Sequence, residues 1–122
     1  MSVGHKVWCL PDLYLKEPFL PSAPSHESVS VANFGAEDAF ITVTIIFEDD
    51  TPPLVVKDIR VGAMRSARIR TDELGEQKRA VPVDTPYSML IKSTQPIVVG
   101  YGRLNWIEGH MQSFGSVAYH EN

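Results

Sequence analysis

Nine consecutive residues, 39–47, alternate so regularly that they fix the class of fold. They read Ala-Phe-Ile-Thr-Val-Thr-Ile-Ile-Phe, with an apolar side chain at every odd-numbered position and many β-branched or aromatic residues. This alternation predicts a β-strand with one face in the core. The opposite face, with Phe40 and Ile46 beside two threonines, is only half polar. A strand that is apolar on both faces is covered on both, so we expect a second layer or a partner subunit.

Further short strands are predicted along the chain, each bounded by turn residues. They are expected around Trp8 and over residues 28–33, 54–61, 64–70, 87–93, 97–105 and 114–120. Residues 48–53, with two prolines, are predicted to connect two strands, and Gln95-Pro96 to separate two others. The best helical candidate is 71–74, barely one turn, with Thr71 as its N-cap. Many short strands with so little helix predict a β-sandwich or a barrel.

Composition limits the broad class of protein. The 122 residues, 43% hydrophobic and 21% charged, are ordinary for one globular domain. The net charge of -4 gives no general attraction to nucleic acid or anionic lipid. Cys9 is the lone cysteine and suits a reducing compartment. The start lacks the apolar core of a signal peptide, and no apolar stretch reaches the roughly 20 residues of a membrane span. We therefore expect a cytoplasmic protein.

Most familiar chemistry finds no support in the sequence. Cys9 lies beside Trp8 in an apolar run, where a small buried side chain is its commoner role. The four histidines lack metal-ligand spacing, so we predict neither a metal site nor a cofactor. The arginines of residues 60–79 lack the interleaved aromatic side chains that stack on bases. Nucleic acid is therefore not an expected partner.

The segment 97–106 is the most informative. On a strand, Ile97, Val99, Tyr101, Arg103 and Asn105 share one face, which changes from apolar to polar toward its end. An arginine there is either paired with acidic groups or available to an anionic or hydroxyl-rich ligand.

A second polar group opens the strand after the proline-containing segment 11–25. Ser25, His26 and Glu27 lie at its start, which is expected at a sheet rim. Rims and loops on rigid scaffolds are where binding sites are usually found.

Several short motifs, taken together in this order, resemble the sensory rhodopsin transducer family. They are Trp8, Ser25-His26-Glu27 leading into Val29–Asn33, Glu37-Asp38-Ala39, Arg65, Pro96-Ile97-Val98-Val99 and Arg103-Leu104. The resemblance extends over nearly the whole chain. It implies an antiparallel β-sandwich of about seven to eight strands, forming a single domain over residues 1–122. It also implies a cytoplasmic homotetramer.

The resemblance further implies a function. The family's namesake takes signals from a photoreceptor in cyanobacteria, and the wider family is similar to a set of domains that bind sugars or related polar metabolites. The family pattern falls here on Trp8, Ser25, His26, Glu27, Asn33, Arg65, Arg103 and Leu104. This chain departs from the pattern at Asn105, where the family has aspartate, and at Gly100-Tyr101-Gly102, where polar residues are usual.

We therefore predict a non-catalytic module that binds a small polar ligand. The predicted ligand-binding residues are Trp8, Ser25, His26, Glu27, Arg65, Arg103 and Asn105. In the opposing interpretation, Glu27 and Arg103 pair only with each other, and Trp8 packs in the core.

Two alternative functions remain open. The chain is either a signalling adaptor for a membrane photoreceptor or other receptor, or a sugar-processing enzyme that uses His26 and Glu27. The enzyme is the weaker alternative, because glycoside hydrolysis generally needs two carboxylates roughly 5 to 10 Å apart and only Glu27 is expected near the pocket.

Overall fold

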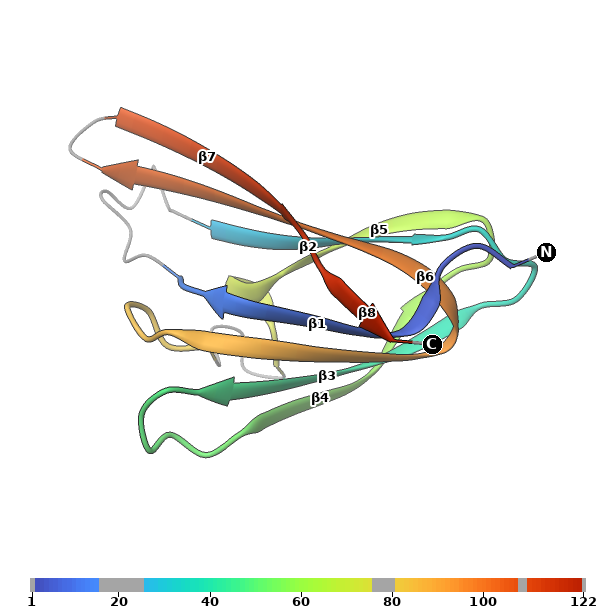
Figure 1. The fold of residues 1–122 in the computed structure, drawn as a ribbon, viewed down its shortest axis with the longest axis horizontal. Helices are drawn as coiled ribbons and strands as arrows, with labels where there is room; N and C mark the ends of the chain where they lie inside the picture. The colour runs from blue at the N-terminus through green and yellow to red at the C-terminus, as the bar shows by residue number, and fades with distance from the viewer. Residues whose placement is uncertain (1, 16–25, 76–80, 108–109, 122) are drawn as a thin grey trace.

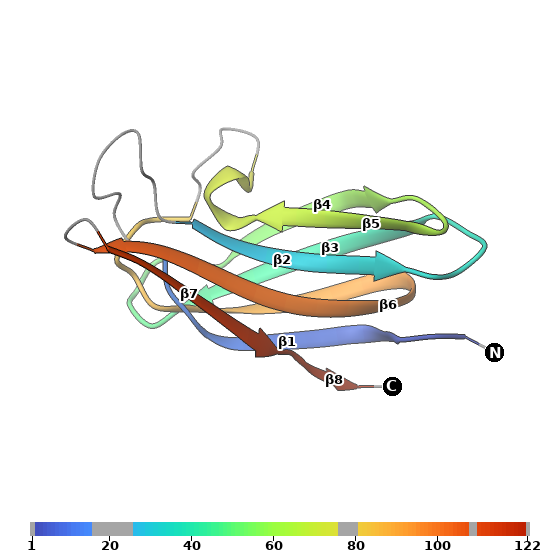
Figure 2. The same ribbon diagram turned by 90° about the horizontal axis from the view of Figure 1, so that it is seen from above.

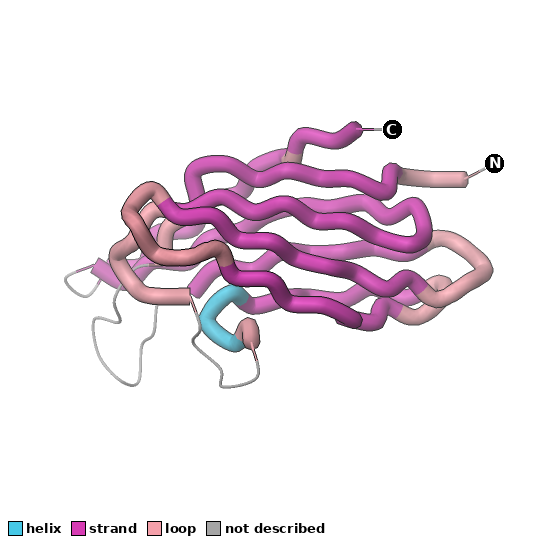
Figure 3. Tube along the Cα trace, turned by 90° about the horizontal axis from the view of Figure 1, so that it is seen from below, coloured by secondary structure: helices cyan, strands magenta, loops and turns pink. Residues whose placement is uncertain are grey.

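A computed structural model describes residues 2–15, 26–75, 81–107 and 110–121. Strands account for most of them, and one short 3-10 helix follows the fifth strand (Figures 1 and 3). The elements are β1 (His5–Leu13), β2 (His26–Asn33), β3 (Ala39–Phe47), β4 (Leu54–Val61), β5 (Arg65–Arg70), η1 (Thr71–Glu73), β6 (Tyr87–Ile107), β7 (His110–Val117) and β8 (Tyr119–Glu121). The prediction of an all-β, antiparallel sandwich is confirmed.

The described strands pair into two sheets that share β6. One, here called the five-stranded sheet, has the order β4-β3-β6-β1-β8. The other, the four-stranded sheet, places β2 between β5 and β6, with β7 on the far side of β6. All of these pairs are antiparallel.

Strand β6 joins the two sheets because it doubles back on itself (Figure 1). Its first part, up to Ser93, pairs with β1 and β3, Ile97 pairs with His5 of β1, and residues from Val98 onward pair with β2. Figure 2 shows the same reversal from above. The prediction that Gln95-Pro96 separates two strands is wrong: the strand continues through this pair and bends there. The bend carries the chain from one layer to the other.

The core lies between the two sheets and follows the predicted alternation. Odd-numbered residues of β3 from Ala39 to Ile45 are fully buried, and Val29 and Val31 of β2 face them from the other layer. In β6, Ile97 and Val99 are buried, as expected for the inner face of segment 97–105. The even-numbered residues of β3 point outward, and Phe40 and Ile46 are exposed.

Residues 71–73 form a 3-10 helix within the predicted helical segment. The prediction that Thr71 caps this helix is wrong. Arg70 occupies the N-cap position, and no side chain makes a capping hydrogen bond there. The Thr71 side chain is instead buried and donates a hydrogen bond to Glu27.

Candidate functional site

The centre of the candidate site is the carboxylate of Glu27, which is 0% exposed at the start of β2. Its Oε1 accepts hydrogen bonds from the hydroxyls of Tyr87 and Thr71, the latter at 3.3 Å. Its Oε2 accepts from the Tyr101 hydroxyl and, at 3.0 Å, from the backbone N–H of Tyr14. A buried carboxylate is tolerated only when its oxygens are satisfied in this way.

The doubled-back course of β6 explains why two tyrosines of one strand meet at this carboxylate. Tyr87 begins the first part of β6, and Tyr101 lies in the second part, which returns toward the same end of the molecule (Figure 1). Thr71 comes from η1, and Tyr14 directly follows β1. Four separate segments therefore converge on the first residues of β2.

Arg103 is the cationic member of the group. Its Nε lies 3.8 Å from Oε2 of Glu27 and donates to the Tyr101 hydroxyl at 3.0 Å. Its second terminal nitrogen donates to the carbonyl of Asp12 at 3.3 Å, where the backbone is left-handed (φ 60°). The Arg103 side chain remains 21% exposed. The guanidinium thus reaches from the buried carboxylate to the surface.

We call Glu27, Tyr14, Thr71, Tyr87, Tyr101 and Arg103 the Glu27 network. Burial raises the pKa of Tyr87 far above its usual value, and the nearby Glu27 carboxylate raises it further. Burial and the hydrogen bond to Glu27 also raise the pKa of Tyr101, against a smaller lowering by Arg103. Both hydroxyls therefore remain protonated donors at physiological pH.

Of the seven predicted ligand-binding residues, the structure brings Glu27 and Arg103 together, as partners across β2 and β6. His26 lies beside them at the start of β2 and is half-buried, but it points to the opposite face of the strand. Ser25 lies outside the described residues. Asn105 pairs with Gln112 through the backbone, and its side chain is outside the description.

Trp8 and Arg65 are not part of this network. The Trp8 side chain is buried in the core, where its indole N–H donates to the carbonyls of His5 and Ile97. Arg65 is exposed at the start of β5, opposite Asn33, and donates to the carbonyl of Met64. The opposing interpretation, with Trp8 in the core and an ion pair between Glu27 and Arg103, therefore describes much of this geometry.

Sequence reasoning did not predict three members of the network: Tyr14, Thr71 and Tyr87. Alternation did place Tyr101 on the same strand face as Arg103, two positions away, although Tyr101 was not among the predicted ligand-binding residues. Tyr87 could have been found only from the reversal of β6, and Gln95-Pro96 predicts a break between two strands there instead. Tyr14 contributes a backbone N–H, which no side-chain motif signals.

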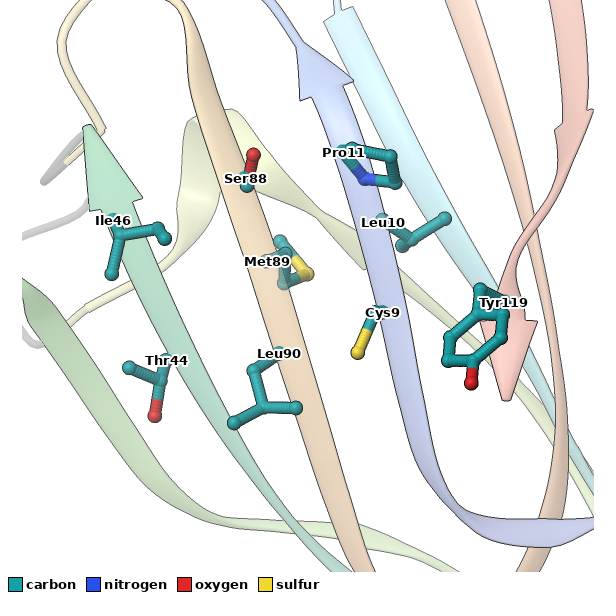
Figure 4. Close-up of a pocket in the computed structure, with 9 residues that line it drawn as sticks. All are labelled: Cys9, Leu10, Pro11, Thr44, Ile46, Ser88, Met89, Leu90 and Tyr119. Carbon is teal, nitrogen blue, oxygen red and sulfur yellow. The ribbon is translucent and has the colours of Figure 1, made fainter. Parts of the chain in front are cut away.

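A second region stands out on the outer side of the five-stranded sheet. A hollow of about 390 Å³ opens there between neighbouring strands (Figure 4). It is lined by Cys9, Leu10, Pro11, Thr44, Ile46, Ser88, Met89, Leu90 and Tyr119. The lining is mainly apolar, unlike the Glu27 network, and the Cys9 thiol is half-buried in it.

Among the residues that the structure describes, no three or more histidine, cysteine, aspartate or glutamate side chains form a cluster that could hold a metal ion. The same residues include no helix that is long and apolar enough to span a membrane.

Comparisons with known proteins agree with this architecture. The family model described as Anabaena sensory rhodopsin transducer matches residues 3–120. Among solved structures, the chain is similar to one titled "Crystal Structure of Thermotoga maritima 1070", with 31% identity and a TM-score of 0.87 over 98% of this chain and 97% of that chain. It is also similar to one titled "Anabaena sensory rhodopsin transducer", with 29% identity and a TM-score of 0.69 over 83% of this chain and 98% of that chain.

No curated protein matches in sequence. The family match nevertheless covers almost the whole chain, and both solved structures share its fold. The chain therefore belongs to the Anabaena sensory rhodopsin transducer family.

Proposed function

We propose that this chain is a non-catalytic, cytoplasmic signalling module that binds a small polar ligand, a sugar or related metabolite, at the mouth of the Glu27 network. The observation that carries the proposal is the position of Arg103. Its guanidinium is held by the Tyr101 hydroxyl and the Asp12 carbonyl, yet it reaches the surface. A charged hydrogen-bond donor that is already held in place before binding loses little side-chain entropy when it contacts a hydroxyl or anionic group of a ligand.

The same network argues for binding rather than catalysis. The Glu27 carboxylate is fully enclosed by its donors, so it does not face solvent as a general acid or base would. Arg103 is the member whose charged end approaches the surface. We therefore assign Glu27 the role of anchoring Arg103, and Arg103 the contact with ligand.

The test is ligand-induced thermal stabilisation over a panel of sugars and polar metabolites. At least one member should raise the melting temperature of the wild type, and Arg103→Ala should abolish that rise. Arg68→Ala is the matched control, because Arg68 is an exposed arginine of β5 on the outer side of the four-stranded sheet. A rise that persists in Arg103→Ala would reject the site. Failure of the whole panel to stabilise the wild type would reject this ligand class.

We further propose that the module works as a homotetramer. The support is the outer side of the five-stranded sheet, where Phe40, Ile46, Val55 and Tyr119 are exposed. Apolar surface of this kind on a sheet face is commonly covered by another subunit. Sedimentation equilibrium at micromolar concentration should give a tetramer, and a monomer would contradict the proposal.

A second candidate function is that of an adaptor for a membrane receptor. The observation in its favour is the similarity to a structure whose title names a sensory rhodopsin transducer. Under this alternative the chain relays a signal by protein contact and needs no ligand of its own. Capture of a membrane receptor by the purified chain, together with a ligand panel that has no effect, would favour the adaptor. A tight small-molecule binder would favour the first proposal.

A further inference from the structure

We propose that the outer side of the four-stranded sheet binds a small tetrahedral oxyanion, such as phosphate, between Ser28, Ser30 and Arg68. This site lies on the opposite side of β2 from Glu27 and does not depend on the ligand proposed for Arg103. The observation that carries it is the Ser28 hydroxyl. Ser28 is 9% exposed, and its Oγ is the one buried side-chain polar atom of the described residues that has no hydrogen-bond partner.

A buried hydroxyl without a partner is unusual in a folded protein. Nearly all buried polar atoms are hydrogen-bonded, and one that is not lowers stability. An alanine would fit the same place on the strand without that cost. The other buried polar residues of the described chain, Glu27, Asn33 and Thr71, are all hydrogen-bonded. Ser28 therefore departs from the rule that its neighbours follow, and such departures are expected at functional sites.

Strand alternation directs the Ser28 side chain away from the core. Its neighbours in β2, Glu27 and Val29, are fully buried, so Ser28 and the exposed Ser30 lie on the outer side. Two positions along a strand separate their Cα atoms by roughly 6–7 Å. The oxygens of one tetrahedral anion can accept from two hydroxyls at this spacing. The Ser28 hydroxyl turns toward such a ligand by rotation about χ1, which moves no backbone atom.

The positive charge comes from β5, which lies beside β2 (Figure 2). Arg68 is paired directly with Ser30, so their Cβ atoms lie about 5 Å apart on the outer side. Arg68 is exposed and forms none of the ion pairs found among the described residues. Arg70, the next outward arginine, is instead held by Asp72 through hydrogen bonds of 2.9 and 2.7 Å. Arg68 is therefore the guanidinium that this face offers to an anion.

Glycines of β6 leave room for the ligand on the other side of β2. Ser30 is paired with Gly100, and Ser28 with Gly102. A Cβ atom added at Gly100 would meet no atom within 4 Å apart from its own chain neighbours, so the space above this part of the sheet is open. The site is thus a shallow shelf of serine hydroxyls and glycine backbone, with Arg68 along one edge.

The composition of the shelf favours an oxyanion over a neutral sugar. The described residues paired across Ser28 and Ser30 include no carboxylate to repel an anion and no aromatic ring to stack on a sugar. The acids that follow β5, Asp72 and Glu73, both form ion pairs with Arg70. Guanidinium and hydroxyl donors together suit phosphate, because hydrogen bonds from a charged donor to an anion are strong.

The test is calorimetric titration of the full chain with inorganic phosphate. The wild type should bind it, Arg68→Ala should weaken binding by about tenfold or more, and Ser28→Ala by roughly threefold or more. Arg65→Ala is the matched control, because it removes an exposed arginine of the same strand that donates to the carbonyl of Met64. Arg103→Ala should also bind phosphate as the wild type does, which separates this site from the proposed ligand site.

A second titrant distinguishes two sources of the same oxyanion. Glycerol phosphate that binds more tightly than inorganic phosphate would identify the phosphate group of a larger metabolite, whereas weaker binding would identify the free anion. Either result supports the site if Arg68→Ala weakens it. A wild type that does not bind either titrant at millimolar concentration, or binding that Arg68→Ala leaves unchanged, would overturn the proposal.

Stability without phosphate gives an independent measurement. Ser28→Ala loses no hydrogen bond within the described residues, so its melting temperature should equal or exceed that of the wild type. Added phosphate should raise the melting temperature of the wild type and leave that of Ser28→Ala nearly unchanged. A Ser28→Ala variant that is less stable without phosphate, and is still stabilised by it as the wild type is, would show that the hydroxyl serves the fold and not the ligand.

Discussion

The Glu27 network and the outer side of the five-stranded sheet, the face that exposes Phe40, Ile46, Val55 and Tyr119, differ in how their side chains are satisfied. In the network, charged and polar groups are buried and find partners within the same chain: Glu27 accepts hydrogen bonds from three hydroxyls and one backbone N–H. On the face, apolar groups such as Ile46 and Tyr119 lie exposed and find no cover within the described residues. The described members of the network therefore have their partners within the chain, whereas the exposed apolar side chains of the face are not covered by the described residues.

The two regions therefore suit different kinds of function. A buried carboxylate that is enclosed by hydrogen-bond donors can hold in position a neighbouring side chain that extends to the surface. Apolar side chains on an uncovered sheet face stabilise a protein only when another surface packs against them and removes them from water. The following substitutions test whether the two regions differ in this way.

The largest effect is expected for Glu27→Ala. This change leaves the hydroxyls of Tyr87 and Tyr101 without their acceptor and Arg103 without its counter-charge. Breaking such a buried group typically costs about 3–5 kcal/mol. Urea unfolding measures the loss, with the exposed Glu48→Ala as a control expected to change stability by less than about 0.5 kcal/mol. A loss below about 1 kcal/mol for Glu27→Ala would show that the network does not support the fold.

The next largest difference in the free energy of unfolding is expected between substitutions of two neighbouring isoleucines of β3. Ile45 is fully buried between the sheets and Ile46 is 55% exposed. Ile45→Ala should destabilise the monomer by about 2–5 kcal/mol because it leaves a cavity. Ile46→Ala should cost the monomer less than about 0.5 kcal/mol while weakening assembly. Equal losses of monomer stability for the two variants would contradict the assigned faces.

A smaller effect is expected in alkaline solution. The pKa of Tyr87 is raised by burial and by Glu27, so the folded chain keeps a proton that the unfolded chain releases above pH 10.0. The stabilisation is fully present below that pH and declines above it, by about 1.4 kcal/mol per pH unit for this group. Tyr101 acts in the same direction.

Urea unfolding between pH 9 and pH 11 measures this slope. Tyr87→Phe should make the slope shallower, whereas Ile46→Ala, in the other region, should leave it unchanged. A slope that is the same in Tyr87→Phe and the wild type would contradict the proton assignment.

The fold was predictable largely because alternation is a local signal. The odd positions of residues 39–45 are buried, as are Ile97 and Val99 on the inner face of the later segment, as the sequence indicates. The outer side of β3 carries the exposed residues Phe40 and Ile46, and its expected cover by a partner subunit stays a prediction. The bend of β6 at Gln95-Pro96 was not predictable in this way, because a proline pair marks a strand end as readily as a corner between sheets.

The candidate site was predictable only in its centre. Glu27 and Arg103 were identified from polar groups at strand rims, and the structure pairs them. Trp8 was expected beside them because aromatic rings suit sugar faces, but its indole is satisfied by the backbone carbonyls of His5 and Ile97 in the core. Which side chains converge depends on where β6 turns, and that is a long-range property that no local pattern carries.

We propose that ligand binding and assembly reside in separate regions of the molecule. Native mass spectrometry with the panel member that stabilises the wild type most measures both at once. Arg103→Ala should keep the wild-type assembly mass and lose the bound ligand, whereas Ile46→Glu should lose the wild-type assembly mass and keep the ligand. If either variant loses both properties while remaining folded, the two regions are not separate and the account fails.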